Sequence, residues 1–118
     1  MPQFVAAPAR IPVPGGKVID EYVGRVNSAT ESVSVAHMTA PGGWDEPAQA
    51  PDFDEVTLVL HGCVRVEHDG GVIDVHAGQA ILTRAGERVR YSCPDPGGAE
   101  YVAICLPAFA PELAHRED

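Results

Sequence analysis

Eight short β-rich runs, separated by turn residues, constrain the fold of this chain more than any other feature. None of them keeps a helical period, and clusters of glycine and proline stand between them. The runs span residues 17–26, 32–39, 55–60, 63–68, 71–76, 79–84, 88–92 and 100–107. Many short strands without crossover helices favour an antiparallel sandwich or a small barrel, so we expect an all-β fold.

Two local patterns sharpen this expectation. Asp69 and Gly70 stand between the alternating runs "VRVEH" and "GVIDV", which predicts a tight hairpin turn. Alternation within "EVTLVL" places Glu55, Thr57 and Val59 on one face of a strand and leaves the opposite face wholly apolar. Outside these runs, only the tail "APELAHRED" is suited to a helical turn.

The length of 118 residues predicts one domain with one hydrophobic core. Prolines near the start confine the first segment to extended geometry, so we expect an N-terminal arm over 1–17, a barrel over 18–107 and a tail over 108–118. The arm is suited to crossing onto a second copy of the chain, which predicts a homodimer. Its apolar side chains would be buried there: Phe4, Val5, Ile11 and Val13.

Charge and cysteine usage bear on the compartment and the partners. The formal net charge is −9 and no cluster of Lys or Arg interrupts it, which predicts that nucleic acid is not a partner. No segment is suited to spanning a bilayer, so no membrane partner is expected. The three cysteines lie far apart without a CxxC pair, which favours a reducing cytoplasm.

Two motif frames resemble those of the cupins, a family of small double-stranded β-helix barrels. Gly43, Gln49, Pro51, Glu55 and Gly62 follow the first cupin frame, G-x5-H-x-H-x3-E-x6-G, without an insertion. The second frame, G-x5-P-x-G-x2-H-x3-N, is followed by Gly78, Arg84, Gly86, Val89 and Cys93. The resemblance covers roughly 18–107 and implies a single-domain RmlC-like jelly roll. "FDEVTLVLHG" with a tryptophan upstream is similar to the branch containing the ethanolamine-utilisation cupin.

The resemblance also implies a metal held at positions 49, 51, 55 and 89. These are Gln, Pro, Glu and Val here, and the side chains of Pro51 and Val89 offer no donor to a metal. The three-histidine site therefore cannot form, and we predict no cofactor. A divalent metal held by a rebuilt set of Glu46, Gln49, Glu55 and His37 remains the alternative.

Glu55 is the first candidate for a catalytic group. If it points into the barrel, burial raises its pKa toward neutrality and makes it a general acid or base. Glu46, in the preceding loop, is the second candidate, because two neighbouring carboxylates push their pKa values apart. The alternatives are a Glu55 that only binds loop amides and a Glu46 that only keeps the loop in solvent.

Six further residues are candidates for ligand binding. Trp44 would form a lid or pack in the core, Gln49 would orient a ligand or lie exposed, and His37 would face the barrel or be structural. Val89 and Tyr91 share one face of their strand, which would line the cavity with Thr57 unless a bulge turned Arg90 inward. The candidate set is Trp44, Gln49, His37, Thr57, Val89 and Tyr91.

Three functions follow from these residues. The first is a metal-independent cupin that binds a small organic molecule and moves a proton through Glu55, as in an isomerisation, elimination or cyclisation. The second is a non-catalytic module that binds a metabolite, in which Trp44 matters more than Glu55. The third is a metal-dependent cupin with a remodelled ligand set.

Overall fold

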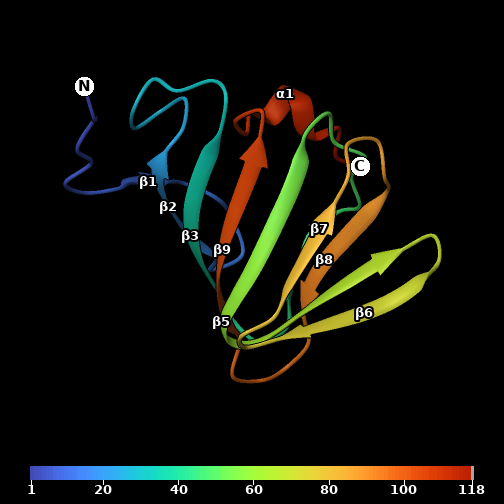
Figure 1. Ribbon diagram of the computed structural model, residues 1–118. Helices are drawn as coiled ribbons and strands as arrows, with labels where there is room; N and C mark the ends of the chain where they lie inside the picture. The colour runs from blue at the N-terminus through green and yellow to red at the C-terminus, as the bar shows by residue number, and fades with distance from the viewer. Residues whose placement is uncertain (118) are drawn as a thin grey trace.

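The computed structural model describes residues 1–117, and nearly all of its regular structure is β (Figure 1). The all-β class and the eight predicted runs are confirmed, with 55–60 and 63–68 joined into one long strand. The hairpin at Asp69 and Gly70 is confirmed as well, since His68 pairs with Gly71. The elements are β1 (Ala9–Ile11), β2 (Val18–Val23), β3 (Ser34–Ala40), β4 (Trp44–Asp45), β5 (Asp54–His68), β6 (Gly71–His76), β7 (Ala80–Thr83), β8 (Val89–Cys93), β9 (Ala99–Leu106) and α1 (Pro111–Ala114).

The long strand β5 joins the two halves of a curled antiparallel sheet. Strands pair in the order β1-β2-β3-β9-β5-β8-β4, and β6 and β7 also pair with β5. The first half of β5 lies between β9 and β7, and its second half lies between β6 and β8. Figure 1 shows the second half of β5 and β6 leaving the body of the sheet as a ribbon. One strand thus serves both halves of the barrel.

Gly62 marks the point where β5 passes from one half to the other. The pairing of β5 with β9 shifts register between Val59 and His61, just before it. Gly62 has φ +79°, and a Cβ added there would lie 2.2 Å from the carbonyl oxygen of Gly98. The glycine that closes the first motif is therefore required by backbone conformation and by close packing.

Alternate side chains along β5 lie on the two faces of the strand as predicted. Thr57 and Val59 are buried, whereas Leu58 and Leu60 on the outer face are about two-fifths exposed. Toward one end the interior is filled by a cluster that includes Val59, Val64 and Val66. Toward the other, Phe53 packs with Cys105 and Ala114, and its ring meets Phe109 edge-on at 5.8 Å. The second cluster fixes α1 against the barrel.

The N-terminal segment lies partly on its own barrel. β1 pairs with β2 from Ala9 to Ile11, and the side chains of Ile11 and Val13 line the cavity of the same chain. The first sheet thus offers these two side chains an apolar surface within the same chain, and their burial against a second copy stays a prediction. Phe4 remains 88% exposed.

The C-terminal segment forms the predicted helical turn, α1, with Pro111 in its first turn. Beyond it the described chain pairs with the loop before β5, where Arg116 forms a bridge with Gln49. The last residue of the predicted tail, 118, lies outside the described residues. No helix in the described part of the chain is long and apolar enough to cross a membrane.

Candidate functional site

A cavity of about 400 Å³ lies inside the barrel between the two apolar clusters. Its walls come from three rows of side chains across β3, β9 and β5, which follow from the strand register. Ser34, Cys105 and Glu55 form one row, and Ala36, Ala103 and Thr57 form the next. The third row brings Met38 beside Tyr101. The period of two along each strand therefore sets what the cavity contains.

Glu55 is half-buried and lines the cavity. Burial raises its pKa to about 7, and the negative charge of Glu46 adds to the rise. The cations Lys17 and Arg116 and the nearby Tyr91 hydroxyl oppose it. Glu55 therefore lies on the inner face, as expected, and its role as an acid or base stays a prediction. A carboxyl group of this kind changes charge within the physiological range.

Lys17 is one of three cations that line the cavity, together with Arg25 and Arg116. Its Nζ lies 4.0 Å from the centroid of the Trp44 ring and 5.4 Å from that of Tyr101. Burial lowers the pKa of Lys17, whereas Glu46 and Glu55 counteract that shift. The ammonium group is therefore held by two aromatic faces and by the field of two carboxylates.

The loop that carries Glu46 is attached to β8 and to the C-terminal segment. Gln49 and Val89 exchange two backbone hydrogen bonds of 2.8 Å. Arg116 donates from Nε to Oε1 of Gln49 at 3.2 Å and pairs with Glu46 across 3.5 Å. Gln49 is buried, and its amide lines the cavity together with the Glu46 carboxylate. These contacts fix both polar groups in place.

Tyr91 and Thr57 complete the polar lining as predicted. Their side chains are buried and line the cavity. The Tyr91 hydroxyl lies 3.2 Å from Oγ1 of Thr83, and burial followed by the charge of Glu55 raises the pKa of its phenol. Tyr91 therefore remains protonated and is a hydrogen-bond donor within the cavity. Arg90, on the alternate face of β8, points outward, so no bulge reverses this strand.

Three of the predicted ligand-binding residues lie elsewhere. His37 is on the outer face of β3, with Nε2 3.2 Å from Oε1 of Glu100, because its neighbours Ala36 and Met38 point inward. Trp44 packs in the apolar cluster and supports Lys17, so the prediction of a lid is wrong and its alternative, a core residue, is correct. Val89 is also buried in that cluster.

Sequence reasoning missed several residues of the site. Lys17, Ile19 and Glu21 line the cavity from β2 and its approach. Their spacing of two in "KVIDE" is the signal that would have identified them. The sequence holds no such signal for Arg116. Its contacts depend on where the C-terminal segment crosses the loop before β5.

The residues do not fit the metal that the motif frame implies. Pro51 and Val89 supply no side-chain donor, and His37 is outside the barrel. Among residues 1–117, no group of three or more His, Cys, Asp or Glu side chains is placed to hold a metal ion. The rebuilt set with His37 is therefore not assembled.

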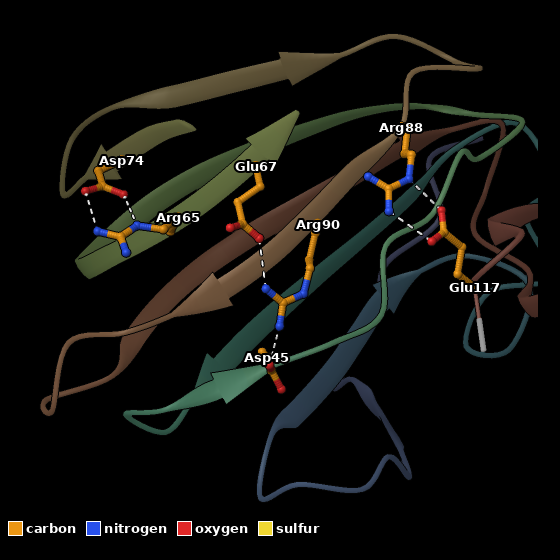
Figure 2. Close-up of polar contacts among 7 residues, drawn as sticks. All are labelled: Asp45, Arg65, Glu67, Asp74, Arg88, Arg90 and Glu117. Atoms are coloured by element: carbon orange, nitrogen blue, oxygen red, sulfur yellow. Dashed lines mark hydrogen bonds and ion pairs between the residues drawn. The ribbon is translucent and has the colours of Figure 1, made fainter. Parts of the chain in front are cut away.

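Most basic side chains outside the cavity are already paired. On the surface of β5, β6 and β8, Arg65 pairs with Asp74, and Arg90 pairs with both Glu67 and Asp45 (Figure 2). Arg88 forms two hydrogen bonds with Glu117 nearby. Arg10 also has an acidic partner, as do Arg25 and Arg116, which line the cavity. This surface therefore offers little free positive charge.

Comparison with known proteins gives one curated relative with clear sequence similarity. No family model matches the chain. Over 107 residues, or 91% of the chain, it is 47% identical to a protein of Myxococcus xanthus named Endoribonuclease YbeY. The chain spans 36% of that relative, which is about a third of its length.

Solved structures share the fold at low sequence identity. An RmlC-like cupin from Shewanella frigidimarina superposes with a TM-score of 0.73 at 18% identity, covering 90% of this chain and 89% of that one. Ethanolamine utilization protein Q of Salmonella typhimurium gives a TM-score of 0.61 at 19% identity, with 79% and 71% covered. The predicted cupin jelly roll and the resemblance to that branch are confirmed at the level of fold.

The curated relative corrects two predictions. The predicted function, a small-molecule cupin with acid–base catalysis or metabolite binding, is contradicted by a 47% identical protein named as an endoribonuclease. The exclusion of nucleic acid is contradicted by the same name. That exclusion used the net charge of −9, which bears on contacts with phosphates but not on contacts with bases.

Proposed function

The chain has the cupin fold, and on that premise we propose that it binds RNA as a component of endoribonucleolytic RNA processing. The 47% identity over 107 residues with an endoribonuclease carries this proposal. Because the chain spans about a third of that relative, the proposal assigns RNA binding to this chain and phosphodiester cleavage to other parts of the system.

The cavity favours this division of roles. Its polar groups lie among apolar side chains such as Ile19, Met38 and Phe109. An unstacked base can enter such a space, because a base is flat and its faces are apolar. A scissile phosphate would bring its negative charge beside four carboxylates, and both arginines of the cavity already pair with acidic side chains.

The surface charge points to base contacts as well. Six of the eight basic side chains form ion pairs in the described structure: Arg10, Arg25, Arg65, Arg88, Arg90 and Arg116. Binding that relied on neutralising phosphates would need free Lys and Arg. We therefore place the RNA-binding site at the barrel cavity, where donors and acceptors are exposed to a ligand.

The state of the three cysteines is consistent with this proposal. Cys63, Cys93 and Cys105 are all buried and none forms a disulfide. RNA processing in a reducing cytoplasm, the compartment predicted from cysteine usage, is consistent with such thiols.

Binding of a labelled RNA tests the function directly. The full chain is titrated into a fluorescein-labelled single-stranded RNA of mixed sequence, and fluorescence anisotropy is compared with that for the same RNA annealed to its complement. We expect the single strand to bind and the duplex to bind at least tenfold more weakly, because paired bases cannot enter the cavity. Intact RNA on a denaturing gel after incubation is the second expected result.

A variant that fills the cavity provides the control for location. Met38→Trp places a larger side chain in the cavity, whereas Val72→Trp adds the same side chain at an exposed position of β6. We expect only Met38→Trp to abolish RNA binding, with both variants folded by circular dichroism. Equal binding by both variants, absence of binding by the wild type, or cleavage of the RNA by this chain would overturn the proposal.

A further inference from the structure

We propose that the outer face of the sheet formed by β2, β3, β9, β5 and β7 is a docking surface for a second copy of the chain. The interface pairs the same face of the two copies across a twofold axis. This inference goes beyond the proposed function and does not depend on RNA being the ligand. It also differs from a dimer held by the N-terminal arm, because it uses side chains in the middle of the sheet.

A continuous row of aliphatic side chains crosses this face. Figure 1 shows β2, β3, β9 and β5 side by side, and cross-strand pairs connect all five strands one after another. The row runs through Val23, Val35, Ile104, Val56 and Leu82. Residues directly opposite one another share a face of the sheet, so these five side chains form one unbroken stripe.

A second aliphatic row lies beside the first, two residues further along the strands. At its centre Leu58 pairs with Val102 on β9 and with Ala80 on β7. We call the first row together with these three residues the outer patch. The patch contains no charged side chain and no aromatic ring.

The outer patch stays in contact with solvent in the described chain, where none of its eight side chains is buried. Leu58 is 38% exposed and Leu82 is 47% exposed. Their neighbours Thr57 and Thr83, which face the interior, are 1% and 5% exposed. The strands therefore hold polar side chains inside and leave aliphatic ones in water, and a contiguous apolar surface of this kind marks an interaction site.

The size of the outer patch suits the centre of a dimer interface. Strands lie about 4.8 Å apart and alternate residues about 7 Å apart, so five strands and two rows cover roughly 300 Å². Each partner of a stable complex buries about 800 Å². The patch supplies the apolar core of such an interface, and the surrounding side chains supply the polar rim that protein interfaces usually have.

Paired charges lie at the rim. Beyond Val102 the second row continues through His37, Asp20 and Arg10. Arg10 pairs with Asp20 at 2.6 Å, and Nε2 of His37 lies 3.2 Å from Oε1 of Glu100. The net charge of −9 is therefore carried mainly by other surfaces, and it opposes the approach of two such faces only weakly once salt screens it.

A protein surface fits the outer patch better than RNA or a lipid bilayer does. Single-stranded RNA is bound by basic and aromatic side chains, and the patch has neither. Anionic membranes attract clusters of Lys and Arg, whereas Arg10 beside the patch is already paired. Among proteins, a second copy is complementary by symmetry, because two twisted aliphatic sheets pack face to face with their strands at about 30°.

Sedimentation equilibrium of the full chain tests the association. We expect the wild type to reach the mass of two chains, with a dissociation constant on the order of 1 µM or below. Leu58→Lys places a charge at the centre of the interface and should weaken the dimer at least a hundredfold. Val72→Lys makes a similar change at an exposed position of β6, outside the patch, and should leave the dimer unchanged.

Two further variants separate this face from the arm and from misfolding. Leu82→Lys, at the edge of the outer patch, should also weaken the dimer, so it decides the question if Leu58→Lys does not fold by circular dichroism. Phe4→Ser removes the exposed aromatic side chain of the arm and should leave the dimer intact.

Each other outcome would overturn the inference. A wild type that stays monomeric far above micromolar concentration would do so, as would a dimer that both lysine variants of the patch leave unchanged. Loss of the dimer in Phe4→Ser alone would assign it to the arm. If the wild type is monomeric and Leu58→Lys loses binding to phosphatidylglycerol vesicles or to RNA, the face belongs to that ligand. The proposed function is tested separately, through Met38→Trp in the cavity.

Discussion

The ammonium of Lys17 lies over the indole ring of Trp44, with Nζ 4.0 Å from the ring centroid. This contact holds a cation inside the barrel at a position where burial alone lowers the lysine pKa. The aromatic face attracts the charged form of the amine, and the carboxylates of Glu46 and Glu55 do the same. The electrostatics of the cavity therefore depend on a residue that precedes β2 and on the single tryptophan of the chain.

Removing this cation should raise the pKa of Glu55. Lys17 lowers that pKa from the value that burial and Glu46 would otherwise impose, so Lys17→Met is expected to move it above about 7. The carboxyl carbon of Glu55, followed by NMR from pH 5 to pH 9, reports the change. Arg10→Met removes a surface cation paired with Asp20 and serves as the control. An unchanged midpoint in Lys17→Met would show that the two groups are not coupled.

Glu55 should also make the stability of the barrel depend on pH. Its pKa is raised from an ordinary value of 4.5 to about 7, so between these values the folded state binds more protons than the unfolded state. The contribution of Glu55 to stability is then present below pH 4.5 and is lost as the pH rises to about 7. The size of the loss is about 3 kcal/mol.

The measurement is urea unfolding of the wild type and Glu55→Gln at pH 5 and pH 8. We expect the free energy of unfolding of the wild type to fall from pH 5 to pH 8 relative to that of the variant, which cannot ionise at residue 55. The comparison of the two chains cancels the titration of the five histidines. Parallel pH profiles would contradict the prediction.

Much of the fold could be predicted because its determinants are local. Turn residues between alternating runs identified the strands, and Asp69-Gly70 identified the hairpin. The spacing of Glu55, Thr57 and Val59 placed them on one face, and the charged face proved to be the inner one. β4 was not anticipated, because a pair of residues carries no periodicity.

The site could be predicted only in part. Alternation shows which side chains share a face of a strand, but it does not show which face lies inside the barrel. His37 was expected to face the barrel, yet Met38 points inward and His37 points outward. Which of two neighbouring side chains points inward depends on how the sheet curls. Arg116 meets Gln49 from 67 residues away, and no local pattern encodes that contact. The exclusion of RNA, which the curated relative contradicts, failed for a different reason, since net charge bears on contacts with phosphates and not on contacts with bases.

Gly62 should be far less tolerant of substitution than another glycine of the same motif frames. Gly62→Ala would place Cβ 2.2 Å from the Gly98 carbonyl oxygen, whereas Gly78→Ala, also at positive φ, meets no atom within 4 Å. We expect Gly78→Ala to cost about 1 kcal/mol and Gly62→Ala to cost about 3 kcal/mol or more. Urea midpoints of the two variants separate the steric clash from the backbone strain that both share. Equal midpoints would show that the sheet relaxes around residue 62.

RNA binding should depend only weakly on salt. Among the basic side chains of the described structure, only Lys17 and Arg84 form no ion pair, and Lys17 is inside the barrel. With so few cations free to displace counterions, the slope of log affinity against log salt should be shallower than about −2. Affinity should then fall less than about 16-fold between 50 and 200 mM salt, as followed by anisotropy.

Freeing one arginine tests the physical reason for that shallow slope. Arg90 is held by both Glu67 and Asp45 on the surface drawn in Figure 2, so Asp45→Asn combined with Glu67→Gln leaves it unpaired. If ion pairing is what keeps phosphates from binding, the double variant should bind RNA more tightly at low salt. Its salt slope should steepen by about 0.7, the value for one added contact with a single strand. A steep slope in the wild type would instead mean that RNA competes successfully with these acidic partners and binds through its backbone.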